Sequence, residues 1–181
     1  LSNLSLKIIN DDSFIDSYKI FEHKLKEAVN NNNTIFFCGN GGSFSDAQHL
    51  VAELVVRFKN DRKPINSILI GANQSNLTAI GNDFDFNEIF MRELSALYRE
   101  GDLVIILSTS GNSKNTIRVA DFLLEKGSKA LAILGKGGGK LKYLTDNIII
   151  PSNDTALIQQ ITIHIGHILC YEIEKKLLEE E

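Results

Sequence analysis

The stretch Thr34-Ile35-Phe36-Phe37-Cys38-Gly39-Asn40-Gly41-Gly42-Ser43 is the strongest indication of the fold class, because a continuous apolar run ends in a glycine-rich turn. A run of this kind, without polar alternation, is typical of a strand buried on both faces. Five such runs occur, over residues 34–38, 66–71, 103–107, 129–134 and 147–150. Segments long enough to form helices separate them. The sequence therefore predicts an α/β fold with a five-stranded parallel sheet sandwiched between helices.

Helices are expected between these strands and at both ends of the chain. The first 33 residues predict one helix, since apolar residues repeat at spacings of four, three, four and three: Phe14, Tyr18, Phe21, Leu25 and Ala28. The tract of four asparagines at 30–33 ends it. Further helices are expected over 44–59, 87–98 and 112–126, with a long C-terminal helix over 155–178. Without an internal repeat or linker, we expect one domain over 1–181, with 1–33 as an N-terminal helical extension.

The composition is that of a globular domain with no strong electrostatic specialisation. Of 181 residues, 43% are hydrophobic and 23% charged, and 19 basic against 23 acidic residues give a net charge of −4. Because the chain has no run of five or six basic residues, electrostatic binding to nucleic acid or to an anionic membrane is not expected. The chain also has no apolar stretch of 18 residues and no pattern typical of a signal peptide. The two cysteines, Cys38 and Cys170, lie in apolar runs, which predicts buried, reduced thiols and a cytoplasmic protein.

Two Gly/Ser-rich loops follow two of the predicted strands. The first, Gly39 to Ser43, comes directly after strand 34–38, and the second, Ser108 to Ser113, follows strand 103–107. In an open parallel sheet, ligands bind beyond the carboxyl ends of the strands, where backbone N–H groups and helix N-termini face an anion. Either loop alone could be an ordinary turn with capping residues. Both loops on one sheet edge favour a site for a phosphate ester.

Other phosphate-binding motifs are absent or weaker. The chain has neither the P-loop pattern nor the dinucleotide-binding glycine pattern followed by an acidic residue. Residues 135–140 form a third glycine cluster after the fourth strand, which we interpret mainly as a flexible turn.

Candidate metal or acid/base residues occur on two predicted helices. His49 and Glu53 are four residues apart, so they share one helix face and can point at one atom, although such a pair is more often a surface hydrogen bond. Gln159, His164 and His167 interrupt the apolar half of the C-terminal helix, where buried polar groups need partners. We interpret His164 as a core or interface residue. Gln159 and His167 lie about 12 Å apart along the helix axis, so spacing alone does not predict that they share a site.

These residues resemble the phosphosugar isomerase (SIS) family, and within it the phosphoheptose isomerases. The resemblance covers about residues 34–175 and includes five motifs: Cys38 to Ser43, Asp46-Ala47-Gln48-His49 with Glu53, Ala79 to Phe84, Ser108 to Ser113, and Ile158-Gln159 with His167-Ile168-Leu169. It implies a flavodoxin-like SIS fold and a homotetramer with active sites at subunit contacts. Members commonly have Arg and Glu where this chain has Leu157 and Gln160, and a small residue at Phe44. Some have Asp at Ala156, which leaves Asp154 as the nearby carboxylate.

The resemblance also implies roles for individual residues. The substrate contacts that it implies are Asn40, Gly41, Gly42, Glu53, Asn82, Asp83, Ser108, Thr109, Ser110, Ser113 and Gln159. The implied Zn²⁺ ligands are His49, Glu53, Gln159 and His167, and the implied acid/base pair is Glu53 and His167.

The implied activity is ketose–aldose isomerisation of sedoheptulose 7-phosphate to D-glycero-D-manno-heptose 7-phosphate through an enediol, for bacterial surface polysaccharide. The alternative is a non-catalytic SIS protein that binds the bacterial replication initiator. Such proteins lack the acid/base pair, so the presence of Glu53 and His167 favours the enzyme.

Overall fold

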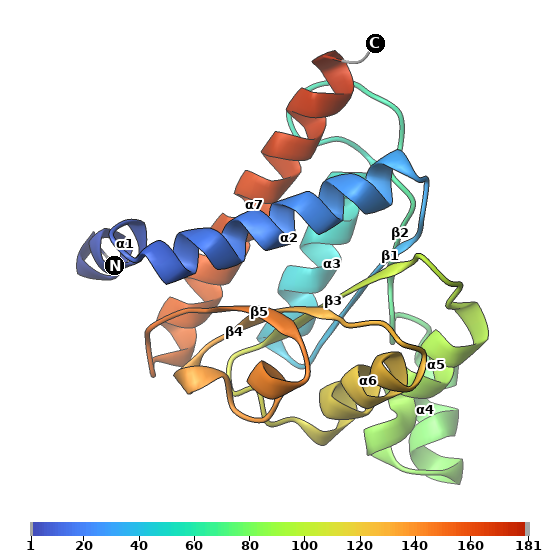
Figure 1. The fold of residues 1–181 in the computed structure, drawn as a ribbon. Coiled ribbons are helices and arrows are strands. Elements are labelled where there is room, and N and C mark those ends of the chain that lie inside the picture. The colour runs from blue at the N-terminus through green and yellow to red at the C-terminus, as the bar shows by residue number, and fades with distance from the viewer. Residues whose placement is uncertain (1, 180–181) are drawn as a thin grey trace.

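The computed structural model describes residues 2–179 and contains one parallel five-stranded sheet (Figure 1). The strand order is β2-β1-β3-β4-β5, and every pair is parallel. The strands are β1 (Ile35–Gly39), β2 (Ser67–Leu69), β3 (Leu103–Ser108), β4 (Leu131–Leu134) and β5 (Asp146–Ile149). The predicted fold class is confirmed, and each observed strand overlaps a predicted one.

Helices cover both faces of the sheet. Figure 1 shows α2 (Asp12–Asn30), α3 (Gly42–Val55) and α7 (Thr155–Glu179) on one face, with α5 (Ile89–Leu97) and α6 (Lys114–Glu125) on the other. Successive side chains of β1 pack on opposite faces of the sheet. Ile35 and Phe37 belong to the core beneath α2, α3 and α7, whereas Phe36 and Cys38 belong to the core beneath α5 and α6. The continuous apolar runs thus reflect burial on both faces.

The N-terminal region differs from the prediction of one helix. Two helices, α1 (Ser2–Ile9) and α2, are separated at Asn10 and Asp11. The Asp11 carboxylate accepts hydrogen bonds from the backbone N–H groups of Ser13 (3.0 Å) and Phe14 (3.3 Å), so it is the N-cap of a new helix. The apolar stripe lies wholly within α2, and the asparagine tract ends that helix as predicted, with Asn32 in the left-handed region at φ +54°.

The structure also contains a helix that the sequence analysis did not predict. Helix α4 (Gln74–Asp83) buries none of its residues and packs against α5, so it has no strong apolar stripe to predict it. The side chain of Asn73 caps its first turn by accepting from Ser75 and Asn76. Three short 3-10 turns complete the connections: η1 (Phe86–Glu88), η2 (Lys136–Gly138) and η3 (Leu141–Tyr143).

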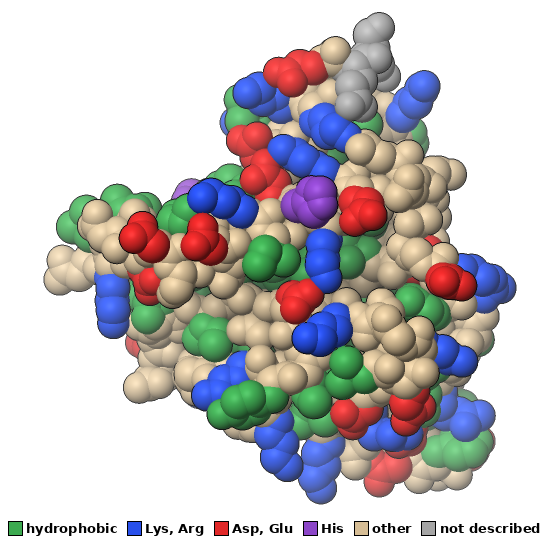
Figure 2. All heavy atoms as spheres, in the orientation of Figure 1, with side chains coloured by type: hydrophobic (Ala, Val, Ile, Leu, Met, Phe, Trp, Pro, Cys, Tyr) green, Lys and Arg blue, Asp and Glu red, His purple; other side chains and the backbone are tan. Residues whose placement is uncertain are grey.

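Both cysteines are buried and unpaired, as the sequence predicts. Burial raises the pKa of the Cys38 thiol to about 12, so this thiol stays protonated and unreactive at neutral pH. Among the described residues, no helix has the length and apolar character needed to cross a bilayer. Basic and acidic side chains are interspersed over the face shown in Figure 2, and neither sign dominates it.

Candidate active site

The two predicted loops meet at the point where the strand order reverses. Strand β1 has β2 on one side and β3 on the other, so the loops after β1 and β3 leave the sheet in adjacent positions. The Asn40 side chain in the first loop exchanges two hydrogen bonds of 2.9 Å with Asn115, in the first turn of α6 directly after the second loop. The structure therefore confirms that both loops lie at one sheet edge, where the crevice of such folds binds ligands.

The loop after β1, residues 39–43, leads into α3 without a side-chain cap. Its N-cap residue, Gly41, has φ +55° and no side chain to cap the first turn, so only its carbonyl accepts there, from the N–H groups of Phe44 (3.1 Å) and Ser45 (3.2 Å). The amide of Gln159 from α7 fills the place that a side chain at Gly42 would need. The loop thus begins α3 without a capping side chain and places Gln159 beside Gly42.

The loop after β3, residues 108–113, likewise leads into a helix whose N-cap residue provides no side-chain cap. The Ser108 hydroxyl is buried and accepts a hydrogen bond from the Gly111 N–H (3.1 Å), which fixes the turn. Ser113 is the N-cap of α6, yet its side chain does not cap the helix. The Asn115 side chain accepts from the Thr116 N–H (2.9 Å), which leaves the N–H groups of Lys114 and Asn115 and the hydroxyl of Ser113 to face an anion.

The third glycine cluster, 135–140, is a structural brace and not merely a flexible turn. The Gly111 position is so close to the Gly138 carbonyl that an added Cβ would overlap it, and Leu141 N–H donates to the Gly111 carbonyl (3.0 Å). Lys140 N–H also donates to the Asn112 side chain (3.0 Å). The glycine segment 135–140 and the residue after it thus stabilise the conformation of the 108–113 loop through these contacts.

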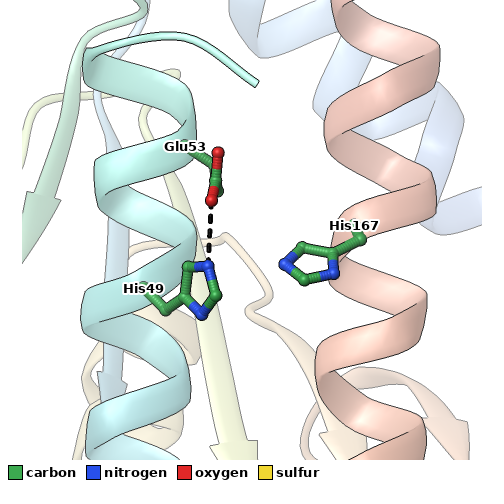
Figure 3. Close-up of side chains that lie close together, drawn as sticks. All are labelled: His49, Glu53 and His167. Carbon is green, nitrogen blue, oxygen red and sulfur yellow. Dashed lines mark hydrogen bonds and ion pairs between the residues drawn. The ribbon is translucent and has the colours of Figure 1, made fainter. Parts of the chain in front are cut away.

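His49, Glu53 and His167 form the centre of the site (Figure 3). One ligand atom from each lies within 4.8 Å of the others. His49 and Glu53 come from consecutive turns of α3 and hydrogen-bond at 2.9 Å, and His167 points at them from α7. The His49 and His167 rings meet edge to face, with centroids 5.0 Å apart. We call these three residues the site cluster.

The parallel course of α3 and α7 explains how distant residues reach the site. Gln159 contacts Gly42 near the start of α3, Gly166 contacts Leu50 further along, and His167 meets Glu53 after that. Gln159 and His167, roughly 12 Å apart along α7, therefore lie beside different parts of α3. The structure places Gln159 beside the 39–43 loop, and its role as a fourth metal ligand stays a prediction.

The site cluster has two unpartnered buried polar atoms in or beside it. His167 Nε2 and one carboxylate oxygen of Asp46, which is one helical turn before His49, are buried without a hydrogen-bond partner. Burial, reinforced by the neighbouring His49, lowers the pKa of His167 despite the opposing charge of Glu53. Desolvation also raises the pKa of Asp46. Because buried polar atoms are rarely left unpaired, the position of His167 Nε2 in this cluster is that of a nitrogen able to bind a ligand or a metal.

Other predicted site residues do not join the cluster. Asn82 and Asp83 are exposed at the end of α4, where the Asn82 amide donates to the Asp83 carboxylate (2.8 Å). The Asp154 carboxylate accepts hydrogen bonds from the N–H groups of Ala156 and Leu157, so it caps α7. His164 is exposed on α7, so the interpretation of a core residue is wrong, whereas an interface role stays a prediction.

Sequence analysis missed three residues that surround the site cluster. The Phe58 ring packs on His167, with centroids 5.5 Å apart. Arg62 and Glu174 form a buried ion pair behind it, with 3.8 Å between Nε and Oε2. No local pattern marks these residues, because Phe58 and Arg62 lie in the irregular loop between α3 and β2. Only the position of Glu174, seven residues after His167 and so on the same helix face, could have drawn attention to it.

Comparison with known proteins assigns the family. The SIS domain model matches residues 19–135. A phosphoheptose isomerase from Helicobacter pylori (strain P12) is 44% identical over 165 residues, which cover 91% of this chain and 86% of that protein. One from a Nitratiruptor species is 46% identical over 150 residues, covering 82% of this chain and 80% of that protein. The chain belongs to the phosphoheptose isomerases of the SIS domain family.

Solved structures agree with this assignment. A phosphoheptose isomerase from Francisella tularensis superposes with a TM-score of 0.89 at 27% identity, covering 96% of this chain and 92% of that one. The chain is therefore an isomerase with the SIS fold. Nothing in the fold or the site favours the non-catalytic alternative.

Proposed function

We propose that this phosphoheptose isomerase converts sedoheptulose 7-phosphate to D-glycero-D-manno-heptose 7-phosphate between α3 and α7. The observation that carries the proposal is the meeting of Glu53 with His167 beside two loops that begin helices without side-chain caps. Ketose–aldose isomerisation moves a proton between adjacent carbons, so it needs a base at carbon and an acid at oxygen. The site cluster supplies one of each.

Glu53 and His167 divide the proton transfers. Glu53 removes a proton from C1 of the ketose while His167 donates a proton to the C2 oxygen, which gives the cis-enediol. His167 then takes the proton of the C1 hydroxyl, and Glu53 returns its proton to C2. Because its pKa is lowered, His167 is neutral at pH 7. The ring nitrogen that gives its proton to the C2 oxygen takes the proton of the C1 hydroxyl in its place, so the imidazole ends the reaction as it began.

The two loops fix the substrate relative to Glu53. The hydroxyls of the 108–113 loop (Ser108, Thr109, Ser110 and Ser113) and the N-terminus of α6 are proposed to hold the phosphate. The sugar is assigned to Asn40, Gly41, Gly42, Gln159, Asn82 and Asp83. An anchored phosphate keeps the reacting carbons near Glu53, and such positioning lowers the barrier by reducing the entropy lost in the transition state.

His49, Glu53 and His167 fit a Zn²⁺ ion, with Gln159 as the proposed fourth ligand. Imidazole nitrogens with a carboxylate are typical zinc ligands, and the buried Nε2 of His167 has no other partner. When bound, the ion would act as a Lewis acid that polarises the substrate oxygens.

We further propose that the enzyme is a cytoplasmic homotetramer and that its product supplies heptose for a bacterial surface polysaccharide. Two buried, unpaired cysteines suit a reducing compartment. An apolar groove along α7 suits contact with a second copy of the chain.

The direct test is an assay with sedoheptulose 7-phosphate. Purified protein is incubated with the ketose as isolated, after chelator treatment, and after Zn²⁺ is added back, and the aldose phosphate is detected by chromatography. We expect product in the first sample, less in the second and recovery in the third. Absence of product from the zinc-loaded enzyme would overturn the proposed reaction.

A further inference from the structure

Glu174 is a buried carboxylate that the proposed reaction does not use. It follows His167 by two helical turns, and its side chain is 1% exposed. It accepts hydrogen bonds from three consecutive backbone N–H groups, those of Phe58, Lys59 and Asn60, at 2.9–3.1 Å. The Asn60 side-chain amide donates a further bond of 3.0 Å. One carboxylate on α7 therefore fixes the backbone conformation of the loop that follows α3.

Arg62 connects the same loop to the end of α3. Its guanidinium donates to the carbonyls of Glu53 (2.7 Å), Leu54 (2.7 Å) and Lys63 (2.9 Å). The carbonyls in the last turn of a helix lack partners within the helix, and a positive charge there is favourable. Arg62 thus holds the backbone of the residue that carries the proposed base.

Phe58 lies where these two sets of bonds meet the site. Its N–H is bound by Glu174, and its ring packs on His167 at a tilt of 34°. The Arg62–Glu174 pair therefore reaches both members of the acid/base pair: Glu53 through a backbone carbonyl and His167 through the Phe58 ring.

Stability alone does not account for such a pair. Taking two charges out of water costs free energy, and well-packed apolar residues in place of a buried ion pair are often as stable or more so. What apolar residues lack is the directional bonding that fixes three N–H groups and two helix-end carbonyls at once. These directional hydrogen bonds therefore suit a role in fixing the position of the loop after α3 relative to the site.

We propose that Arg62 and Glu174 are positioning residues for the isomerase, which hold Phe58 against His167 and Glu53 in register with it. The proposal deepens the proposed function and rests on it. Neither charged group contacts a side chain of the site cluster in the described contacts, so their effect passes through Phe58 and the backbone carbonyl of Glu53.

A double-mutant cycle on kcat tests this coupling. We expect Glu174→Gln and Phe58→Leu each to lower kcat roughly 10-fold to 100-fold, because small misplacements of catalytic groups cost that much. KM should change less than about threefold, because the phosphate loop is untouched. The double variant should be no slower than the slower single variant. Phe58→Tyr, which keeps the ring, should retain the wild-type kcat.

Histidine NMR gives a readout that is independent of turnover. The chain has four histidines, so ¹³C-labelling of their rings gives few signals. In the metal-free protein, loss of the Phe58 ring current should shift the His167 signal in Phe58→Leu, and Glu174→Gln should shift it in the same direction. The His23 signal should stay in place in both variants.

A matched control removes a different ion pair. Asp146 pairs with Lys24 at 2.5 Å, at the start of β5 and so at the opposite edge of the sheet from the site. Asp146→Asn should leave kcat and the His167 signal unchanged. All rates are measured well below each variant's unfolding temperature, and Phe58→Leu carries the test if Glu174→Gln does not fold.

The positioning role is overturned by a wild-type kcat in folded Glu174→Gln or in Phe58→Leu, by additive losses in the double variant, or by an unmoved His167 signal. If the wild-type enzyme does not turn over sedoheptulose 7-phosphate, the proposed reaction fails. The NMR comparison then still decides whether Glu174 positions Phe58.

Discussion

At the scale of single residues, the site depends on polar side chains held in apolar surroundings. Glu53 is partly buried and His167 is packed between the rings of His49 and Phe58. Low exposure strengthens electrostatic interactions and makes unpaired polar atoms costly. The Glu53 side chain, which is 21% exposed, and the buried Nε2 of His167 therefore interact more strongly with their neighbours than fully exposed groups would.

Glu53→Gln tests the base. The amide has nearly the same shape but accepts no proton from carbon, so we expect kcat to fall about 10²-fold to 10⁴-fold. Binding of the sugar phosphate, measured by calorimetry, should change only a few-fold because the 108–113 loop is unaltered. Wild-type turnover in this variant would refute the assignment of the base.

Glu174 predicts a pH dependence of stability. Burial alone would raise the pKa of this carboxyl, but the hydrogen bonds from Asn60, Lys59 and Phe58 outweigh it and lower the pKa below its ordinary 4.5. The ionised group therefore stabilises the fold fully above about pH 4.5 and loses this contribution as pH falls through the lower, folded-state pKa. Urea unfolding from pH 6 to pH 3 should show a steeper loss of unfolding free energy for the wild type than for Glu174→Gln. Parallel curves for the two proteins would contradict this account.

At the scale of elements, the site exists because α3 and α7 run in parallel at close range. Gly166 on α7 allows this approach: a Cβ there would lie 2.5 Å from a methyl carbon of Leu50 on α3. The contact is one residue before His167 and one after His49. The separation of the two helices at this point therefore sets the separation of the site cluster.

Gly166→Ala tests this dependence. The added methyl group must displace Leu50 within a filled core, so we expect a loss of about 1–3 kcal/mol in unfolding free energy together with a lower kcat. Gly81→Ala is the matched control for stability, because Gly81 is also helical and nothing lies within 4 Å of its Cβ position. It should be neutral or stabilising by up to about 1 kcal/mol, since alanine favours helix. Equal unfolding free energies for the two variants, measured by urea titration, would show that the helices are not in tight contact at Gly166.

At the scale of the whole molecule, an apolar groove of about 530 Å³ lies between α7 and the two N-terminal helices. Its lining includes Phe14, Tyr18, Ile161 and Ile168, and the Tyr18 hydroxyl is buried without a hydrogen-bond partner. Exposed apolar patches of this kind mark interaction sites. The groove is therefore the expected contact surface of the proposed tetramer.

Ile168→Asp tests the role of the groove. A carboxylate on its wall should prevent apolar contact, so we expect a smaller particle than the wild type in sedimentation velocity. Tyr143→Asp serves as control, because Tyr143 is 76% exposed and lies outside the groove. A wild-type sedimentation coefficient for Ile168→Asp would place the subunit contacts elsewhere.

Local patterns predicted much of the fold. Continuous apolar runs indicated the buried strands, and the 3.6-residue period indicated α2, because these patterns record burial directly. The sequence did not reveal α4, which buries no residues, or the break at Asp11, where one capping carboxylate interrupts an otherwise helical region.

The sequence alone predicted the layered α/β fold, the two loops at one sheet edge and the i,i+4 spacing of His49 and Glu53. Each follows from a pattern within a short stretch of chain or from the common direction of parallel strands. The folded structure was needed to show that His167 faces Glu53, that Gln159 lies beside Gly42, and that Arg62 and Glu174 bind the loop after α3. Those contacts join residues that are far apart in the chain. They follow from how α3 packs against α7, and the packing of two helices is a property of the folded core that no local pattern encodes.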